Sequence, residues 1–322
     1  MDLILATSKF TAQTITQTVF EKMNNKTNQK EGELKCTTPV KVLFEGADLD
    51  IYHKTDKLDK SVVDELSQIP ESFCYLMVGH WIKGNLGQDR KGIGMTIKTF
   101  CETFKNTSLK NAPALVFKGS GAGFSIMDRD MIQNKISDIL EPYGDNAPNV
   151  YLLHGDLSDH EMNSLYNHPK IKAMISFTKG EGYGRPLAEF SLTGKPVIAS
   201  NFSGQLDFLH PEYCSLLPGH LTEVDTSAAD RFILKESKWF TVQYNYASKI
   251  IKDVFKNYKT YLEKSRKQPH YIRTNFSMDK MTETFNDILS EVKTPEKVEL
   301  KLPKLKTPSK MAQIKLPKLN KV

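Results

Sequence analysis

Five short apolar segments alternate with helix-like segments between residues 74 and 200, and this alternation limits the possible folds more than any other feature. Four of the five segments are mostly apolar, as expected for strands covered on both faces of a sheet. Strands that alternate with helices are typical of a parallel sheet. The sequence therefore predicts an α/β protein with strands at 74–79, 114–119, 150–155, 173–177 and 196–200, and helices at 92–106, 126–140, 158–167, 186–193, 241–265 and 277–291.

The first 53 residues predict a small unit that cannot stand alone. They contain an apolar strand (Leu3–Ala6), a helix at roughly 9–23, a polar loop and a second strand (Val40–Phe44). Two strands and one helix have too few neighbours to bury their apolar faces. We therefore expect this unit to dock on another structure.

Composition narrows the class of protein. With 322 residues, of which 39% are hydrophobic, the chain can bury a substantial core. No run of 18 apolar residues occurs, and the first 20 residues lack the features of a secretory signal, so we expect a cytoplasmic protein. The four cysteines show neither CxxC nor Cys/His ligand spacing, which predicts free, buried thiols and no zinc site.

The formal charge of +6 is unevenly distributed. Residues 292–322 carry nine lysines and two glutamates, a net +7, and the remainder of the chain is at −1. This tail contains the repeat KLPKLK and KLPKLN, whose prolines block a helix. The composition favours a flexible, disordered tail. The alternative is a tether to an anionic surface such as nucleic acid, a membrane or an acidic protein.

The turn at 178–186 carries the strongest chemical signal. Ligands of parallel α/β sheets bind where strands lead into helices. Gly182 and Gly184 let the backbone approach a ligand, and Pro186 suits the first helical position, so the turn is suited to a phosphate.

Two glutamates, Glu181 and Glu189, bracket this turn. A carboxylate can accept hydrogen bonds from two adjacent hydroxyl groups. Glu189, one turn into the helix, is placed for a ribose, and Glu181 for a second polyol. The alternative is an ordinary helix start with acidic residues that the helix dipole favours.

These residues carry a resemblance to a known family. The segment from Glu181 to Glu189 reads E-G-Y-G-x-P-x-x-E and resembles the EX7E motif of the retaining GT-B glycosyltransferases, in particular family four. The segment T-G-K-P-V-I-A-S that follows also resembles that family. The similarity covers roughly residues 1–291, with further blocks in family order at 46–52, 78–79, 90–92, 116–121 and 150–166.

The resemblance implies a Rossmann-like donor-binding fold and the transfer of a sugar from a nucleoside diphosphate sugar to a hydroxyl acceptor with retention. It implies no cofactor and no metal. The implied catalytic residues are Lys91, which would neutralise the leaving diphosphate, and Glu181, which would hold the donor sugar. The implied donor-binding residues are Gly79, His80, Arg90, Lys91, Leu157, Glu181, Gly182, Tyr183, Gly184 and Glu189. For Lys91, an ordinary surface lysine is the alternative.

One position departs from the family pattern. The family usually places an arginine directly after the glycine of the first strand, where this chain has His80. Histidine is uncharged in most molecules near pH 7. Arg90 and Lys83 are the candidates to replace the missing cation, and the sequence leaves the choice between them open.

Two DxD triplets, 48–50 and 128–130, raise the question of a metal site. The first falls in a loop and the second in a predicted helix, so we favour turn or surface carboxylates over metal ligands. His154 follows a predicted strand and is a candidate for a base pocket with Leu157. A hydrogen-bonded turn histidine is the equal alternative.

The similarity divides the chain into four parts. Residues 1–60 resemble the end of an acceptor domain and its linker, 61–240 the donor-binding domain, 241–291 the C-terminal helices, and 292–322 the tail. Most of the acceptor domain is thus expected to be absent, and a partner chain is one possible source of it. The alternatives to a glycosyltransferase are an inactive interaction module and, on the same fold, a sugar-nucleotide epimerase.

Overall fold

A six-stranded parallel sheet forms the centre of the protein in a computed structural model that describes residues 2–108 and 110–292. Its strand order is β10-β9-β8-β5-β6-β7. The five predicted strands are confirmed within a few residues at their ends, and β10 adds a sixth that the sequence did not reveal. The strands are β5 (Cys74–His80), β6 (Ala114–Ser120), β7 (Val150–Leu153), β8 (Ile171–Ser176), β9 (Val197–Ser200) and β10 (Ser215–Leu217).

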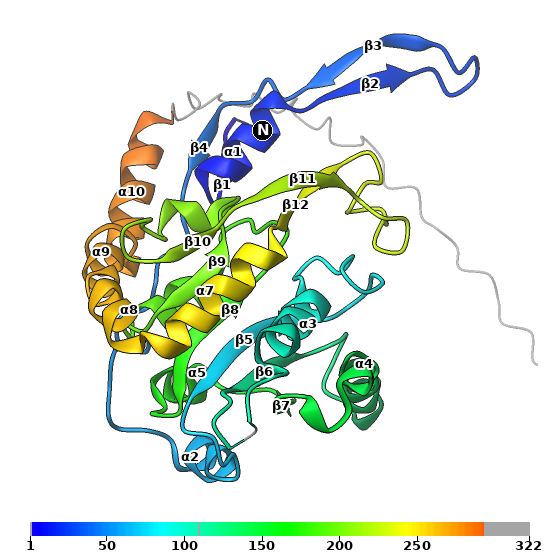
Figure 1. Cartoon of the computed structure of the whole chain (residues 1–322). Helices are drawn as coiled ribbons and strands as arrows, with labels where there is room; N and C mark the ends of the chain where they lie inside the picture. Colours follow the sequence, from blue (N-terminus) through cyan, green and yellow to red (C-terminus); the bar gives the residue numbers. More distant parts are fainter. Residues whose placement is uncertain (1, 109, 293–322) are drawn as a thin grey trace, which may run out of the picture.

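Helices cover both faces of this sheet (Figure 1). Successive side chains of a strand point to opposite faces. Cys74 and Leu76 of β5 therefore lie in one apolar core, and Tyr75 and Met77 in the other. The first core includes residues of α2 (Lys60–Ser67), α5 (Asp159–Asn167), α6 (Arg185–Ser191) and α9 (Gln268–Asn275), and the second includes residues of α3 (Ile93–Phe104), α4 (Ile126–Leu140) and α7 (Tyr244–Lys256).

The N-terminal unit docks on the rest of the chain, as its size requires. β1 (Ile4–Ala6) pairs in parallel with β4 (Val40–Val42), and α1 (Lys9–Gln17) follows β1. The ring of Phe10 packs edge-on against Phe202, and the Thr11 hydroxyl donates to the Gly182 carbonyl over 3.2 Å. This unit therefore lies directly against the glycine-rich turn.

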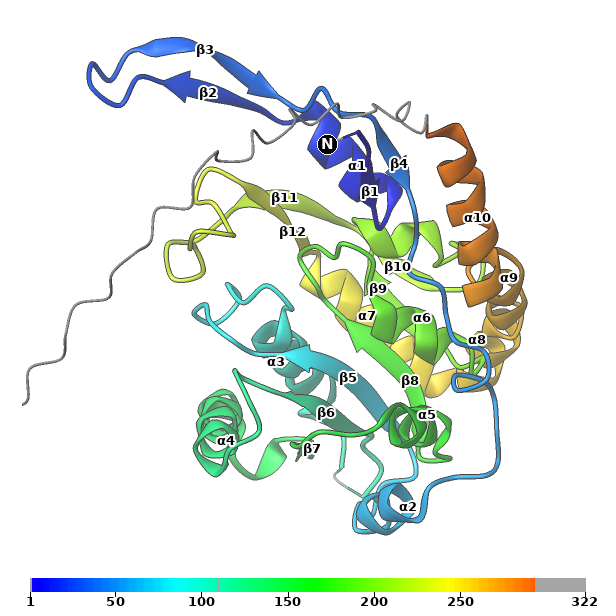
Figure 2. The same ribbon diagram turned by 180° about the vertical axis from the view of Figure 1, so that it is seen from behind.

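Two sequence predictions near the ends of the chain are wrong in part. The helix predicted at roughly 9–23 ends at Gln17, and the next residues form an antiparallel hairpin of β2 (Val19–Met23) and β3 (Lys30–Lys35) that projects from the body (Figure 2). β-Branched and aromatic residues favour strand over helix there. The Asn24 side chain closes the turn by accepting two backbone N–H groups.

The predicted long helix at 241–265 is also divided. Its first residues belong to β12 (Lys238–Val242), which pairs with β11 (Gly219–Glu223). The remainder forms α7 and α8 (Tyr258–Ser265), separated by Asn257 with a non-helical backbone. α10 (Met278–Glu291) closes the described chain, close to the predicted 277–291, and the short helices η1 (Glu141–Asn146) and η2 (Gly204–Asp207) complete the fold.

Three further expectations concern the cysteines, membrane-spanning helices and the basic tail. Cys74, Cys101 and Cys214 are free and buried, but Cys36 is only partly buried because it lies at the base of the projecting hairpin. Within residues 2–108 and 110–292, no helix has the length and apolar character needed to cross a bilayer. The prediction for the basic tail falls on residues 293–322, outside the described part of the chain.

Candidate functional site

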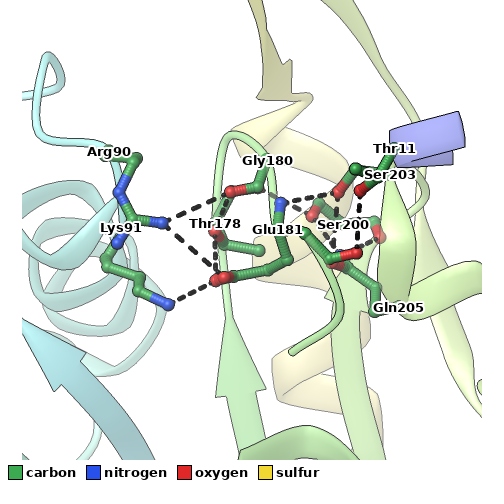
Figure 3. Close-up of polar contacts among 10 residues, drawn as sticks. Thr11, Arg90, Lys91, Thr178, Gly180, Glu181, Ser200, Ser203 and Gln205 are labelled. Atoms are coloured by element: carbon green, nitrogen blue, oxygen red, sulfur yellow. Dashed lines mark hydrogen bonds and ion pairs between the residues drawn. The ribbon is translucent and has the colours of Figure 1, made fainter. Parts of the chain in front are cut away.

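Loops from two strands bring two cations and one carboxylate together at the carboxyl edge of the sheet. Arg90 and Lys91 come from the loop between β5 and α3, and Glu181 from the turn between β8 and α6. Lys91 Nζ lies 2.5 Å from Glu181 Oε1, and Arg90 Nη1 lies 3.6 Å from Glu181 Oε2 (Figure 3). Lys91 and Glu181 are 90 residues apart in the sequence, and the parallel pairing of β5 with β8 brings their loops together.

The carboxylate of Glu181 is held in a fixed position. The Thr178 hydroxyl donates to Oε1 over 2.7 Å, and the Glu181 backbone N–H donates to Ser203 Oγ over 2.8 Å. Its side chain is 11% exposed, against 43% for Arg90. The three charged groups leave one net positive charge on this part of the surface, which favours an anionic ligand.

Glycines allow the loops to approach this closely. A Cβ at Gly79 would lie 3.4 Å from the Lys91 side chain, whose stem runs along that residue. A Cβ at Gly204 would lie 2.1 Å from the Gly182 carbonyl oxygen, so the loop after β9 directly supports the turn. Gly184 has a φ of 105° and precedes α6, in which Pro186 is the second residue and not the first.

The backbone N–H groups of the turn are available to a ligand. Those of Gly182, Tyr183 and Gly184 donate to no acceptor among the described residues. Gly182 is exposed, so water can satisfy its N–H group, but Tyr183 is buried and Gly184 half-buried, and N–H groups in such positions nearly always have a partner. A bound acceptor such as a phosphate oxygen would satisfy them.

Glu189 belongs to a different part of the site. Its carboxylate lies 3.2 Å from Arg185 Nη2 and 3.3 Å from the Tyr166 hydroxyl, and among the described residues it shares no partner with Glu181. Burial raises the pKa of Glu189, an effect that Arg185 opposes. The carboxylate lines a cavity of about 380 Å³ together with Tyr52 and Asp159. The two glutamates therefore flank the turn but have different neighbours, and Glu189 lines this cavity while Glu181 contacts Lys91 and Thr178.

Three more predicted site residues lie outside the charged cluster. His80 Nδ1 lies 2.9 Å from Ser120 Oγ, and burial together with Lys91 lowers the pKa of His80. Leu157 packs at the margin of the first apolar core. The Tyr183 ring is buried against Phe208, and its hydroxyl has no partner among the described residues.

The aspartates of the two DxD triplets have structural partners. Asp48 Oδ1 accepts the backbone N–H groups of Asp50 and Ile51. The Asp128 carboxylate accepts two N–H groups of the preceding loop and lies 2.9 Å from His154 Nε2. These contacts are typical of turn and capping carboxylates. In the described ranges, no group of three or more His, Cys, Asp or Glu residues is arranged to hold a metal ion.

The sequence analysis missed the residues that support Glu181. Thr178 and Ser203 contact it directly. Gln205 in turn holds Ser203, because the Ser203 hydroxyl donates to Gln205 Oε1 over 3.3 Å and Gln205 Nε2 donates to the Ser200 carbonyl (Figure 3). Ser203 has a φ of 70°, which is uncommon for a residue other than glycine. The only signal in the sequence was the small-residue pair Ser203-Gly204 after β9.

The parallel sheet with helices on both faces is the architecture of one Rossmann-like half of a GT-B protein. No protein-family model matches the sequence, and no curated protein matches it. Among solved structures, the chain is similar to sucrose-phosphate synthase from Thermosynechococcus elongatus (TM-score 0.60, 15% identity, 90% of this chain and 58% of that chain). It is also similar to a glycosyltransferase from Rickettsia africae (TM-score 0.60, 15% identity, 90% and 63%).

A third similar structure contains a nucleotide. It is Anabaena HepE in complex with UDP and glucose (TM-score 0.58, 14% identity, 90% of this chain and 63% of that chain). This chain thus spans 58% to 63% of the length of the three structures. At these identities the likeness shows the fold, which confirms the predicted Rossmann-like half of a GT-B protein.

Gly92, at the start of α3, allows a stability test of the loop that carries Lys91. Its φ is 65°, and a Cβ there would lie 2.4 Å from the Phe177 carbonyl oxygen. We expect Gly92→Ala to lower the free energy of unfolding by roughly 2–4 kcal/mol, because it combines left-handed strain with a clash. Urea unfolding measures the loss.

Gly194→Ala is the matched control. Gly194 also has a positive φ, 75°, but a Cβ there would come no closer than 3.5 Å to Pro269, an ordinary van der Waals contact. We expect it to cost about 1–2 kcal/mol through backbone strain alone. Equal losses in the two variants would contradict the close packing of Gly92 on Phe177.

Proposed function

We propose that this protein is a glycosyltransferase that takes a sugar from a nucleoside diphosphate sugar and transfers it to a hydroxyl acceptor with retention of configuration. One observation carries the proposal: Arg90 and Lys91 converge on Glu181 at the carboxyl edge of a GT-B sheet. This arrangement combines cations for a diphosphate with a carboxylate for sugar hydroxyls.

The cations support the departure of the nucleoside diphosphate. Cleavage of the bond between the sugar and the diphosphate leaves negative charge on the leaving oxygen, and a fixed cation stabilises that charge. Lys91 is suited to this role because its stem is confined against Gly79 and its ammonium is 2.5 Å from Glu181. The unpaired N–H groups of the glycine-rich turn would bind further phosphate oxygens. In this proposal no metal ion is needed.

The carboxylates support the recognition of two sugars. Glu181 lies beside Lys91, so a sugar attached to a phosphate on Lys91 would meet its carboxylate. Glu189 faces its cavity with Asp159 and Tyr52, which add further oxygen acceptors and a hydroxyl. We assign this cavity to the ribose, because adjacent hydroxyl groups suit a carboxylate that accepts two hydrogen bonds.

We infer the direction of attack on the sugar from the contacts of Glu181. The carboxylate that we assign to the donor sugar, Glu181, is already engaged by Lys91 and Thr178, which makes it a poor nucleophile. We therefore favour attack of the acceptor on the face from which the diphosphate leaves, with a phosphate oxygen taking the acceptor proton. That geometry retains the configuration of the sugar. The similarity to HepE with bound UDP and glucose supports a nucleotide sugar as the donor.

Calorimetry tests the ribose assignment. We expect the protein to bind one of UDP, GDP and ADP, and Glu189→Gln to weaken that binding about 10-fold, since a neutral amide is a poorer acceptor for two hydroxyl groups. The 2′,3′-dideoxy form of the same nucleotide should bind wild type and variant equally. Glu212→Gln, at an exposed position, is the control. No heat with any of the three nucleotides would favour an interaction module.

A further inference from the structure

The strand β7 leaves one side of the six-stranded sheet open, next to α2 and α4 (Figure 1). Within the described part of the chain, no strand lies beyond it. We propose that this edge is the docking site for an extended segment of a partner protein, in which apolar and basic residues alternate and which adds one more parallel or antiparallel strand to the sheet. Such docking is independent of the proposed glycosyl transfer.

Some backbone groups of β7 have no partner in the sheet. β6 and β7 pair in parallel with Leu115 opposite Val150, and the Leu115 N–H donates to the Asn149 carbonyl over 3.0 Å. Successive residues of a strand point their N–H and C=O groups to alternate sides. Asn149 and Tyr151 therefore bond to β6, while the N–H and C=O groups of Val150 and Leu152 point to the open edge. A neighbouring strand would form up to about four hydrogen bonds with these two residues.

β7 lacks the features that keep a free strand edge from pairing. Natural edges are blunted by short strands, by lysine or proline residues, or by bulges. All residues of β7 (Val150–Leu153) are uncharged and half-buried, and its register with β6 has no shift. The opposite edge strand, β10, has only 3 residues, and Lys264 lines the groove beside it. Of the two edges of the sheet, β7 is therefore the one suited to pairing.

Two grooves lie along the open edge. The first has a volume of about 380 Å³, and its walls include the buried apolar residues Leu66, Ile69 and Val116. The second follows the connection from α4 through η1 to the start of β7, where exposed Glu141 and Asp145 line it. α2 packs on one face of β7 and α4 on the other. Because strand side chains alternate between faces, an added strand would direct every second side chain to each groove.

The residues of the grooves favour a partner that is both apolar and basic. Among the described residues that line them, Glu65, Glu141 and Asp145 are acidic and exposed, and none is lysine, arginine or histidine. On the α2 face, apolar side chains of the partner would cover Leu66 and Ile69. On the α4 face, basic side chains would meet Glu141 and Asp145. A second copy of this chain is less suited, because pairing β7 with β7 would bring two acidic rims together.

Titration of the full chain with short peptides tests the proposal. The probe is an acetylated, amidated peptide of about seven residues in which lysine and valine alternate. One control peptide has the same composition with the valines grouped together, and another has glutamate in place of lysine. We expect the probe to bind at least about fivefold more tightly than either control, because only the probe matches both the alternating faces and the acidic residues.

N-methylation of the probe tests the backbone contacts without any change to the protein. Methyl groups on alternate peptide residues remove either the N–H groups that face β7 or those that face away from it. We expect one of the two methylated probes to bind at least about 10-fold more weakly, while the other stays within about threefold of the unmodified probe. Equal binding of the two methylated probes would exclude an added strand.

Reversing the charge of the second groove tests its part in recognition. We expect the double variant Glu141→Lys, Asp145→Lys to bind the lysine probe about fivefold more weakly and to bind the glutamate peptide more tightly than wild type does. The control is Glu212→Lys, Glu263→Lys, which reverses two exposed acids on other segments. An unchanged melting temperature of each double variant shows that the fold is kept.

Three results would overturn the proposal. The first is that wild type does not bind the lysine probe. The second is an equal loss in the two double variants, which would indicate a general attraction between opposite charges. The third is self-association of wild type in analytical ultracentrifugation that the probe reverses, because a second copy of the chain would then occupy the edge.

Discussion

Replacing Lys91 by alanine is expected to lower the rate of donor cleavage at least about 100-fold and to weaken nucleoside diphosphate binding about 10-fold. The Lys91 side chain is 17% exposed and its ammonium is bonded to Glu181, so water cannot take over its role at full strength. The loss should be larger in the transition state than in the bound donor, because negative charge develops on the leaving phosphate. Hydrolysis of UDP-, GDP- and ADP-sugars and calorimetry with the free nucleotides measure the two effects.

Lys98→Ala is the matched control for this prediction. Lys98 belongs to α3, the helix that Lys91 precedes, and its side chain is exposed. The substitution removes the same charge from a nearby exposed position without touching Glu181. Equal activity of the two variants would show that Lys91 is an ordinary surface lysine, which was the alternative from the sequence.

The second prediction with a large effect is that the free energy of unfolding depends on pH because of Lys195. This lysine, in the segment after α6, donates to the carbonyl groups of Tyr166 and His168 over 2.7 and 2.9 Å. Within the described chain no carboxylate oxygen lies within 4 Å of its ammonium. Burial, with smaller effects from Lys172 and Lys54, lowers the pKa of Lys195 from 10.5 to about 7.

The direction of the effect follows from proton binding. Below about pH 7 both the folded and the unfolded chain hold the proton, so the folded state bears the full cost of a buried charge. Between about pH 7 and 10.5 the folded state releases the proton and the unfolded state keeps it, so stability rises with pH. The difference corresponds to at most about 5 kcal/mol.

Lys195→Met isolates this contribution. The variant loses two hydrogen bonds at every pH but has no charge to bury. We therefore expect the unfolding free energy of wild type, relative to the variant, to increase by several kcal/mol as the pH rises from about 6.5 to about 10. Urea unfolding at several pH values measures the change, with exposed Lys267→Met as the control. A constant difference between wild type and Lys195→Met would contradict the buried-charge explanation.

Local patterns in the sequence were sufficient for five of the six strands of the sheet and for part of the site. These five strands were predictable because each is a short segment, four of them mostly apolar, and burial on both faces leaves little freedom in composition. Glu181 was identified from its position in the glycine-rich turn, which needs only neighbouring residues. The hairpin after α1 was missed because its residues are exposed, and no apolar periodicity marks an exposed strand.

Only the tertiary structure decided which side chains act together. The sequence determined that this chain forms a parallel α/β sheet with a glycine-rich turn between two glutamates. It could not show that Glu181 meets Arg90 and Lys91 while Glu189 faces a cavity away from them, nor that Lys83 forms an ion pair with Asp230. Local preferences fix each strand and turn, but contacts between residues about 90 or 150 positions apart depend on strand order and loop packing, which arise when the whole core is buried.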